Sequence, residues 1–279
     1  MSAPVPSTAD TALVDELLAA RRSVRPLAAL PSERDPSFDL DRAFVVAEAI
    51  RRARVEAGEQ VRGYKIGFTN RTIWDRYGVH APIWGPVWDS TLELLPDGVT
   101  EASLSLVPYA EPRLEPEIVF GLAKTPTPGM DGAALAACIE WVAHGFEIVH
   151  THCAGWRFAA ADTVADFALH GRLIIGPRVP MRAFGDDPGA AFERLTVDLF
   201  DGDRRVETGR GANVLGGPLT ALSAWVDAMA AQTPHWTIEP GHVVTTGTLT
   251  DAQPLVPGQT WRTVPDDPRL AGLVLRTTH

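Results

Sequence analysis

The sequence predicts an α+β fold in which a helical N-terminal region, residues 1–60, precedes a β-rich region, residues 61–279. The first supporting observation is the helical spacing of apolar residues in two segments of the N-terminal region. The second is a change at Val61 to short strand-like segments separated by glycine and proline, which continues to the end of the chain. A chain of 279 residues is long enough for one large domain, or for a small domain attached to a large one.

Two helices are expected in the N-terminal region. The first covers residues 8–23, where leucines recur at helical spacing after a serine and a threonine that are suited to capping. The second covers residues 39–57 and ends at Gly58. Residues 24–38 contain three prolines and little periodicity, so we expect a loop whose length is typical of a lid or a substrate-side loop.

The β-rich region is predicted to alternate short strands with a few helices. The dipeptide Asp201-Gly202 is a hairpin signal between two of the strands. Strands are expected at residues 64–66, 145–149, 173–175, 195–200, 204–207, 242–246 and 273–276. Helices are expected at residues 71–77, 132–144 and 218–230, with a short helix or turn at 162–170.

The composition is that of an ordinary globular protein, with 45% hydrophobic and 22% charged residues. The net charge of −10 argues against binding to nucleic acids or membrane surfaces, which requires basic patches. The two cysteines, Cys138 and Cys153, lack the spacing of a zinc site and are expected to be free thiols. The N-terminus lacks signal-peptide features, and no stretch approaches the roughly 18 apolar residues of a membrane span. We therefore expect a soluble cytoplasmic protein.

The segment Arg113-Leu114-Glu115-Pro116-Glu117-Ile118-Val119-Phe120 carries two glutamates one residue apart. Because side chains alternate along a strand, Glu115 and Glu117 point to one side and the apolar residues form a core face on the other. The two carboxylates raise each other's pKa, and a divalent cation such as magnesium, manganese or calcium would offset their repulsion. A third acid, Glu147, lies in another short apolar run. The alternative is an exposed strand face that carries two acids and binds no metal.

Lys65 is one of only two lysines in the chain and stands in the apolar segment Gly63-Tyr64-Lys65-Ile66-Gly67. Codon bias towards arginine explains the low lysine content. A lone lysine among apolar residues is nevertheless poorly suited to solubilising a surface, so Lys65 is a candidate contact for an anionic substrate.

Further segments follow one another in an order that is specific as a set, although each is weak alone. They are Gly63-Tyr64-Lys65-Ile66-Gly67-Phe68-Thr69, Gly78-Val79-His80-Ala81-Pro82-Ile83-Trp84-Gly85, Glu115-Pro116-Glu117-Ile118, Phe146-Glu147-Ile148-Val149, Asp162-Thr163-Val164-Ala165-Asp166, Gly209-x-Gly211-Ala212, Leu215-Gly216-Gly217-Pro218-Leu219 and Gly241-His242-Val243-Val244. With these segments the chain resembles the 2-hydroxypentadienoate hydratase and 4-oxalocrotonate decarboxylase family of the fumarylacetoacetate hydrolase superfamily.

This resemblance implies a mixed β-roll with an N-terminal helical region, assembled as a homo-oligomer of two or more copies. It also implies a Mg²⁺ or Mn²⁺ ion held by Glu115, Glu117 and Glu147. The expected partner is a small 2-keto or 2-hydroxydienoic acid.

The same resemblance assigns roles to residues around the metal. Lys65 matches a lysine beside the substrate carboxylate, and Asp89 matches an acid placed for proton transfer. Thr248 and His170 are expected to contact the substrate as well.

The expected reaction is the metal-dependent addition of water to a 2-hydroxy-2,4-dienoate, giving a 4-hydroxy-2-keto acid in the breakdown of aromatic compounds. The same metal site would also serve a 2-keto acid decarboxylase or a C–C hydrolase of acylpyruvate-like substrates. The hydrolases of the superfamily use a His–Glu pair on an N-terminal loop, whereas residues 24–38 contain Glu33 but no histidine. A catalytically silent subunit is a further alternative, against which the intact acids and Lys65 argue.

The chain departs from the hydratase pattern between residues 150 and 170. His150 and His152 replace an Asp and an Arg, and Asp166-Phe167-Ala168-Leu169 replaces an Asp-Asn-x-Ser segment. These histidines could be general bases, or could orient Glu147 and other side chains from within the core. Five tryptophans could enlarge an apolar pocket or simply belong to the core: Trp74, Trp84, Trp88, Trp141 and Trp156.

Overall fold

The computed structural model describes residues 6–279, without the side chains of Ile73 and Arg76. Helices α1 (Thr8–Ser23) and α3 (Leu40–Glu56) confirm the two predicted N-terminal helices. Each begins at a polar cap: the Ser7 side chain accepts the backbone N–H of Asp10, and Asp39 accepts that of Arg42. The segment between them is not only loop, because Pro31–Arg34 forms the short helix α2 with proline in its first turn.

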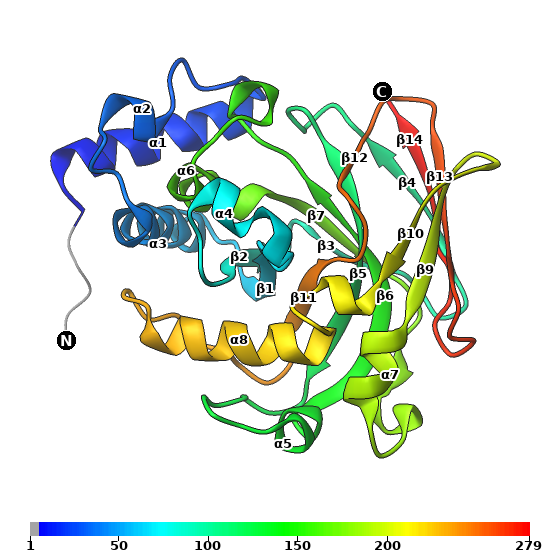
Figure 1. The fold of residues 1–279 in the computed structure, drawn as a ribbon. Coiled ribbons are helices and arrows are strands. Elements are labelled where there is room, and N and C mark those ends of the chain that lie inside the picture. The colour runs from blue at the N-terminus through cyan, green and yellow to red at the C-terminus, as the bar shows by residue number, and fades with distance from the viewer. Residues whose placement is uncertain (1–5) are drawn as a thin grey trace.

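The strands form two sheets (Figure 1). The nine-stranded sheet has the order β2-β1-β11-β5-β6-β7-β3, with β12 paired to β5 and β8 paired to β6. Its strands are β1 (Val61–Gly67), β2 (Ile83–Trp88), β3 (Leu92–Leu94), β5 (Arg113–Leu122), β6 (Ile139–Val149), β7 (His170–Ile175), β8 (Val179–Pro180), β11 (Val243–Thr248) and β12 (Gln253–Pro254). The five-stranded sheet, in the order β10-β9-β13-β14-β4, consists of β10 (Arg204–Arg210), β9 (Thr196–Asp201), β13 (Thr260–Pro265), β14 (Val274–Thr278) and β4 (Glu101–Ser105).

The long sheet curls between the helices on one side and the five-stranded sheet on the other (Figure 1). The remaining helices are α4 (Trp74–Tyr77), α5 (Gly132–Ala136), α6 (Ala160–Ala165), α7 (Pro188–Arg194) and α8 (Pro218–Ala231). Short 3₁₀ helices cover η1 (Arg71–Ile73), η2 (Ala154–Trp156), η3 (Phe167–Leu169), η4 (Met181–Phe184) and η5 (Gly211–Asn213). Of these, α8 and the pair η1 and α4 were expected from the sequence, which also predicted a helix from residue 132 and a short helix or turn at 162–170.

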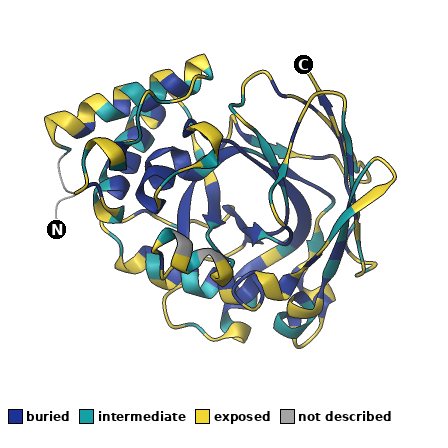
Figure 2. Ribbon diagram, turned by 45° about the horizontal axis from the view of Figure 1, so that its top comes forward, coloured by how far each residue is buried: buried dark blue, intermediate teal, exposed yellow. Residues whose placement is uncertain are grey.

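Three groups of buried apolar side chains hold these layers together, and the central strands are buried almost throughout (Figure 2). The largest group joins the N-terminal helices to the long sheet, for example Leu17 and Phe44 to Ile66, so both regions share one core. A second group lies between the two sheets and includes Leu114. The third contains Val119, which is on the same face of β5 as the two glutamates.

The helix predicted over residues 132–144 is wrong beyond Ala136. The chain turns after α5 and enters β6, which pairs with β5 from Leu122↔Ile139 to Arg113↔Val149. Of the apolar residues that suggested a helical stripe, Leu135 lies in α5, whereas Ile139 and Val142 lie on a mostly buried strand, where periodicity does not separate the two structures. The segment 162–170 likewise divides into the end of α6, the turn η3 and the first residue of β7.

The segment Gly211–Ala231 is long and apolar enough to span a membrane by length and composition. It consists of η5, the following turn and α8. In the fold, α8 buries Leu222, Trp225 and Met229 completely or nearly so. This is the packing of a core helix, and a core helix can have the same length and apolar composition as a membrane-spanning one.

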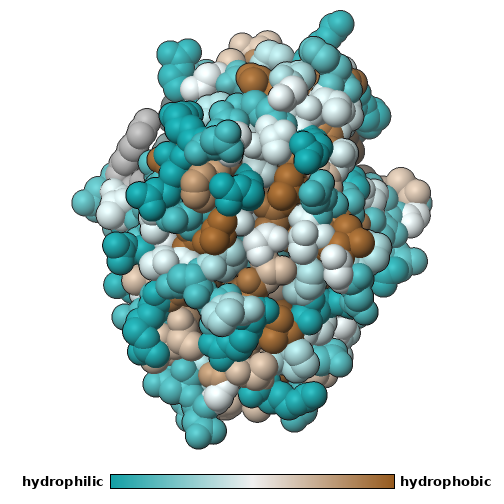
Figure 3. Space-filling view, turned by 90° about the vertical axis from the view of Figure 1, so that its right-hand side faces the viewer, coloured by the Kyte–Doolittle hydropathy of each residue, from teal (hydrophilic) through white to brown (hydrophobic). Residues whose placement is uncertain are grey.

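The face of the molecule around the five-stranded sheet is mostly hydrophilic, with apolar side chains scattered among polar ones (Figure 3). Isolated apolar residues are normal on a protein surface. Both cysteines are buried free thiols, as predicted.

Candidate metal and substrate site

Three glutamates converge on the inner face of the curled sheet. Glu115 and Glu117 stand on β5, and Glu147 stands on β6 directly opposite Glu115 in the register. One oxygen from each lies within 4.8 Å of the others. Glu117 and Glu147 are 0% exposed, so the prediction of a wet strand face is wrong although the shared orientation is confirmed.

Two completely buried oxygens of this cluster, Oε1 of Glu117 and Oε2 of Glu147, have no hydrogen-bond partner within the described part of the chain. Oε2 of Glu147 has an ion-pair contact with Lys65 (3.2 Å), so of the two only Oε1 of Glu117 is without any polar contact among the described residues. The other oxygens are bonded: Glu117 Oε2 accepts the N–H of Gly247 (2.8 Å), and Glu147 Oε1 contacts Nδ1 of His170 (2.8 Å). Buried carboxylate oxygens left without donors are costly unless a cation binds them, so the cluster fits a hard divalent ion.

The position that donates an N–H to Glu117, Gly247, requires glycine. Its φ of +104° is in a region that L-residues rarely adopt, and an added Cβ would lie 1.9 Å from Oγ1 of Thr69. The irregular pairing between Thr245 and Thr248 of β11 and strand β5 turns this amide towards Glu117.

Burial and mutual repulsion shift the acids in different directions. Burial, opposed in part by Lys65, raises the pKa of Glu115 to about 7. Burial and the two neighbouring carboxylates raise the pKa of Glu117 well above its usual value. Burial also opposes ionisation of Glu147, but Lys65 and His170 outweigh it and lower the pKa of Glu147. When no metal is bound, Glu147 is therefore the acid whose ionised form is stabilised. Glu115 and Glu117, in contrast, bind protons readily.

We expect the metal-free protein to lose stability as the pH rises from about 4.5 to 7. Glu115 and Glu117 bind protons more tightly when folded than when unfolded, so unfolding releases protons in this range and becomes easier. A bound divalent ion takes the place of the protons and should flatten the dependence. Thermal unfolding from pH 4.5 to 8 measures how the unfolding temperature changes with pH, once in EDTA and once in Mg²⁺. An equal change with pH in both conditions would contradict the prediction.

Lys65 is brought to the cluster from β1, as predicted. It is 3% exposed, and its Nζ lies 3.2 Å from Oε2 of Glu147. Burial alone would lower the pKa of Lys65, but the three carboxylates outweigh it and raise the pKa. The ammonium group therefore remains charged in an otherwise closed part of the sheet.

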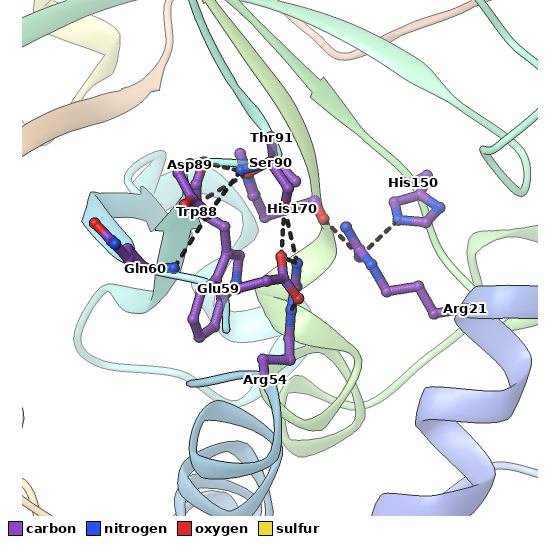
Figure 4. A network of polar contacts seen from close by, with 10 residues as sticks. All are labelled: Arg21, Arg54, Glu59, Gln60, Trp88, Asp89, Ser90, Thr91, His150 and His170. Carbon is purple, nitrogen blue, oxygen red and sulfur yellow. Dashed lines mark hydrogen bonds and ion pairs between the residues drawn. The ribbon is translucent and has the colours of Figure 1, made fainter. Parts of the chain in front are cut away.

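His170, which the sequence predicted as a substrate contact, lies on β7 with its ring beside Glu147. Its Nδ1 lies 2.8 Å from Glu147. Its Nε2 lies 2.9 Å from Oγ1 of Thr91 (Figure 4). An ionised carboxylate only accepts, so Nδ1 carries the proton, and in the neutral ring Nε2 accepts the hydroxyl of Thr91. With both ring nitrogens in use, His170 orients a ligand residue.

We expect His170→Asn to weaken Mn²⁺ binding by about 10- to 100-fold, because residues that orient metal ligands typically contribute this much. Titration calorimetry with Mn²⁺ measures the change. The matched control is His144→Asn, since His144 is equally buried but bonds the backbone oxygen of Glu117 and the hydroxyl of Thr263. Equal affinity of wild type and His170→Asn would refute the assignment.

Asp89 is not brought to the cluster. It is exposed after the end of β2, where its Oδ1 accepts the N–H groups of Gln60 (3.1 Å) and Ser90 (2.9 Å) (Figure 4). Strand β2 places Gly85 opposite Lys65, and Asp89 lies four residues further along and beyond the strand's last pair. Its observed role is to hold a turn, so the proposal below gives it no part in proton transfer.

The other two histidines lie in the core behind the site. His150 Nε2 is 3.1 Å from Nη1 of Arg21, which comes from α1, and His152 Nδ1 is 2.6 Å from Oδ1 of Asp166 (Figure 4 shows the former). Burial and the charge of Arg21 hold the pKa of His150 well below its usual value. Of the two interpretations from the sequence, their positions support a structural role.

A pocket of about 490 Å³ opens above the cluster. Lys65, Glu115 and the predicted contact Thr248 line it, whereas residues 24–38 do not. Its other walls combine aromatic and apolar residues with polar ones. The former include Phe68, Tyr77, Ile83, Trp156, Phe158 and Leu169, and the latter include Thr69, Asn70, Thr250, Asp251 and Gln253. Among the five tryptophans only Trp156 lines this pocket; Trp84 and Trp88 are buried in the core.

One functional candidate in the pocket was missed. Arg113 lines the wall near Glu115. The signal was present, because Arg113, Glu115 and Glu117 occupy alternate positions of one strand and must share a face.

The chain was compared with known proteins. No family model matches it. A 2-hydroxyhexa-2,4-dienoate hydratase of Comamonas testosteroni is 33% identical over 242 residues, 86% of both chains. A 4-oxalocrotonate decarboxylase of a Pseudomonas species is 32% identical over 243 residues, 83% of this chain and 87% of the other.

Among solved structures, 4-oxalocrotonate decarboxylase from Pseudomonas putida G7, complexed with magnesium and adipate, superposes with a TM-score of 0.87. The superposition covers 99% of this chain and 100% of the other at 23% sequence identity, which confirms the predicted fold. The sequence relatives extend the likeness from the fold to the family. The chain belongs to the 2-hydroxypentadienoate hydratase and 4-oxalocrotonate decarboxylase family of the fumarylacetoacetate hydrolase superfamily.

Proposed function

We propose that this protein is a divalent-metal-dependent hydratase that adds water to a 2-hydroxy-2,4-dienoate and forms a 4-hydroxy-2-keto acid. The observation that carries the proposal is the cluster of three converging carboxylates beside a charged lysine at a pocket; among the described residues, the buried Oε1 of Glu117 has no polar partner. The relative at 33% identity is named a hydratase of a substrate of this class.

Glu115, Glu117 and Glu147 would hold a Mg²⁺ or Mn²⁺ ion. When bound, such an ion acts as a Lewis acid towards the substrate's carboxylate and C2 oxygen. Lys65 presents N–H donors at the same place and stabilises negative charge that develops on the C2 oxygen. Gly247 and His170 keep Glu117 and Glu147 in position.

The pocket walls contribute by shaping the site and excluding water. Phe68 and Tyr77 are in ring contact (5.1 Å), as are Tyr77 and Phe158 (5.6 Å), so one side of the pocket is a continuous aromatic surface. A flat conjugated acid is suited to such a surface. Excluding bulk water strengthens the contacts of Lys65 with an anionic substrate.

Decarboxylation of a 2-keto diacid on the same site is the second candidate, favoured by the relative at 32% identity that is named a decarboxylase. Loss of carbon dioxide from such an acid also leaves an enolate at C2 that the site would stabilise. A C–C hydrolase is less well supported: Glu33 accepts the N–H of Leu30 within the α2 turn, in a segment that does not line the pocket.

Turnover assays decide between these reactions. Purified protein is incubated with 2-hydroxypenta-2,4-dienoate or 2-oxohex-3-enedioate, with Mg²⁺ or Mn²⁺ and with EDTA. Loss of dienol absorbance with a 4-hydroxy-2-keto product, abolished by EDTA, supports hydration. Release of carbon dioxide from the diacid without hydration of the monoacid would move the protein to the decarboxylases.

We further propose that the protein acts as a homo-oligomer in the cytoplasm, as the family resemblance implies. Light scattering coupled to size exclusion measures the assembly. A monomer that is fully active would contradict the oligomer proposal without affecting the proposed reaction.

A further inference from the structure

Arg113 places a positive charge inside the substrate pocket. It is the first residue of β5 and shares the inner face of the sheet with Glu115 and Glu117. One two-residue step along the strand, about 6.8 Å, separates its Cα from that of Glu115. The arginine therefore lies further along the pocket than the three carboxylates and Lys65.

Its guanidinium group rests on an aromatic platform. The Cζ of Arg113 lies 4.1 Å from the centroid of a Trp156 ring. The indole N–H of Trp156 donates to the backbone oxygen of Glu111 (3.0 Å), and the N–H of Gly155 donates to the Glu111 carboxylate (2.9 Å). These bonds fix the platform, and hence the arginine above it.

The edge of this guanidinium lacks an acceptor. Within the described part of the chain Arg113 has no hydrogen-bonded or ion-paired partner, whereas Arg54 is paired with Glu59 and Arg172 with Glu93. The pKa of Arg113 is lowered by burial, against the opposing charges of Glu115 and Glu111. A partly desolvated guanidinium stacked on an indole, with its donors open to a pocket, is suited to bidentate binding of a carboxylate.

The ordinary structural interpretation is that Arg113 covers the indole of Trp156 and does nothing else. That role would not require a position inside the pocket, two residues from a metal-binding acid. The near end of the pocket already has Lys65 for the carboxylate next to C2. A second cation further along the same wall matches a second carboxylate at the far end of the substrate.

We propose that Arg113 binds the distal carboxylate of the substrate, so that the preferred substrate is a dicarboxylic 2-hydroxydienoate or its 2-keto form. This inference rests on the proposed function for the identity of the near end of the substrate. It holds for hydration and for decarboxylation alike, since both begin from a substrate that Arg113 has bound.

The test compares two six-carbon substrates that differ only at the far end: 2-hydroxyhexa-2,4-dienoate, with a methyl group, and 2-hydroxyhexa-2,4-dienedioate, with a carboxylate. Wild type should have the higher kcat/KM on the diacid. Arg113→Gln should lower kcat/KM for the diacid by about 10- to 100-fold, the value of a charged hydrogen-bonded pair, and change that for the monoacid by less than about threefold. Arg113→Lys should retain only part of the wild-type kcat/KM for the diacid. Lysine keeps the positive charge but lacks the planar guanidinium group that binds a carboxylate through two N–H donors.

The matched control is Arg205→Gln, an exposed arginine paired to Asp198 on the five-stranded sheet, which should leave both substrates unaffected. Unchanged Mn²⁺ affinity of Arg113→Gln shows that the site is folded. An equal loss on both substrates, no loss on the diacid, or a wild-type preference for the monoacid would each overturn the proposal.

Binding without turnover separates this inference from the proposed function. Adipate and hexanoate are titrated into the Mg²⁺-loaded protein by calorimetry. If neither dienoate is turned over but adipate still binds more tightly than hexanoate, and only through Arg113, the proposed reaction fails and the inference stands. If both dienoates are turned over but Arg113→Gln leaves adipate binding unchanged, the inference fails and the reaction stands.

Discussion

Replacing Glu117 by glutamine is expected to abolish metal binding and turnover. Glu117 is completely buried, and its Oε1 has no other partner within the described residues. Residues that only orient metal ligands are worth 10- to 100-fold in affinity, so loss of a ligand charge should weaken Mn²⁺ binding by more than about 100-fold. The amide is similar in size and can still accept the N–H of Gly247, so the fold should be retained.

The stability of the same variant provides a second readout. Glutamine removes a buried charge that burial and two carboxylates disfavour, so the EDTA-treated variant should unfold at the same or a higher temperature than EDTA-treated wild type. Glu101→Gln, an exposed change on β4, is the matched control and should alter neither metal affinity nor activity. A fully active Glu117→Gln variant would contradict the assignment of the site.

Replacing Lys65 by methionine should separate catalysis from metal binding. The ammonium group lies 3.2 Å from Glu147 and repels any cation held there, so Lys65→Met should bind Mn²⁺ at least as tightly as wild type. Turnover should nevertheless fall by about 100- to 1,000-fold, the usual effect of removing one group that stabilises developing negative charge.

Lys124→Met is the matched control, because Lys124 is the other lysine of the chain and is exposed. Steady-state kinetics and Mn²⁺ titration are measured on both variants. If Lys65→Met lost metal and activity together, Lys65 would be a structural support of the carboxylates and not a group that acts on the substrate.

Local rules predicted the parts of the site that lie on one strand. The two-residue period of a strand placed Glu115 and Glu117 on one face, and this is correct. That Glu147 joins them depends on the register of β5 with β6, where Glu115 is opposite Glu147. No local pattern specifies that register; here it came from the family resemblance.

The errors arose where tertiary structure decides the role of a residue. Apolar residues at 135, 139 and 142 fit a helix by spacing, but β6 forms because β5 pairs with its whole length. His170 was expected at the substrate, and only the packing of β7 against β6 shows that it lies behind Glu147. Asp89 directly follows Trp88, the last paired residue of a strand whose middle faces Lys65, and the sequence alone does not reveal its distance from the cluster.

The central claim is that Glu115, Glu117 and Glu147 hold a divalent metal ion, and anomalous X-ray diffraction from Mn²⁺-soaked crystals tests it most directly. The account predicts a single strong manganese peak within bonding distance of one oxygen from each of the three carboxylates, and no peak at this place in crystals of Glu117→Gln. A fully soaked wild-type crystal without a peak between these residues, or with manganese bound elsewhere, would contradict it.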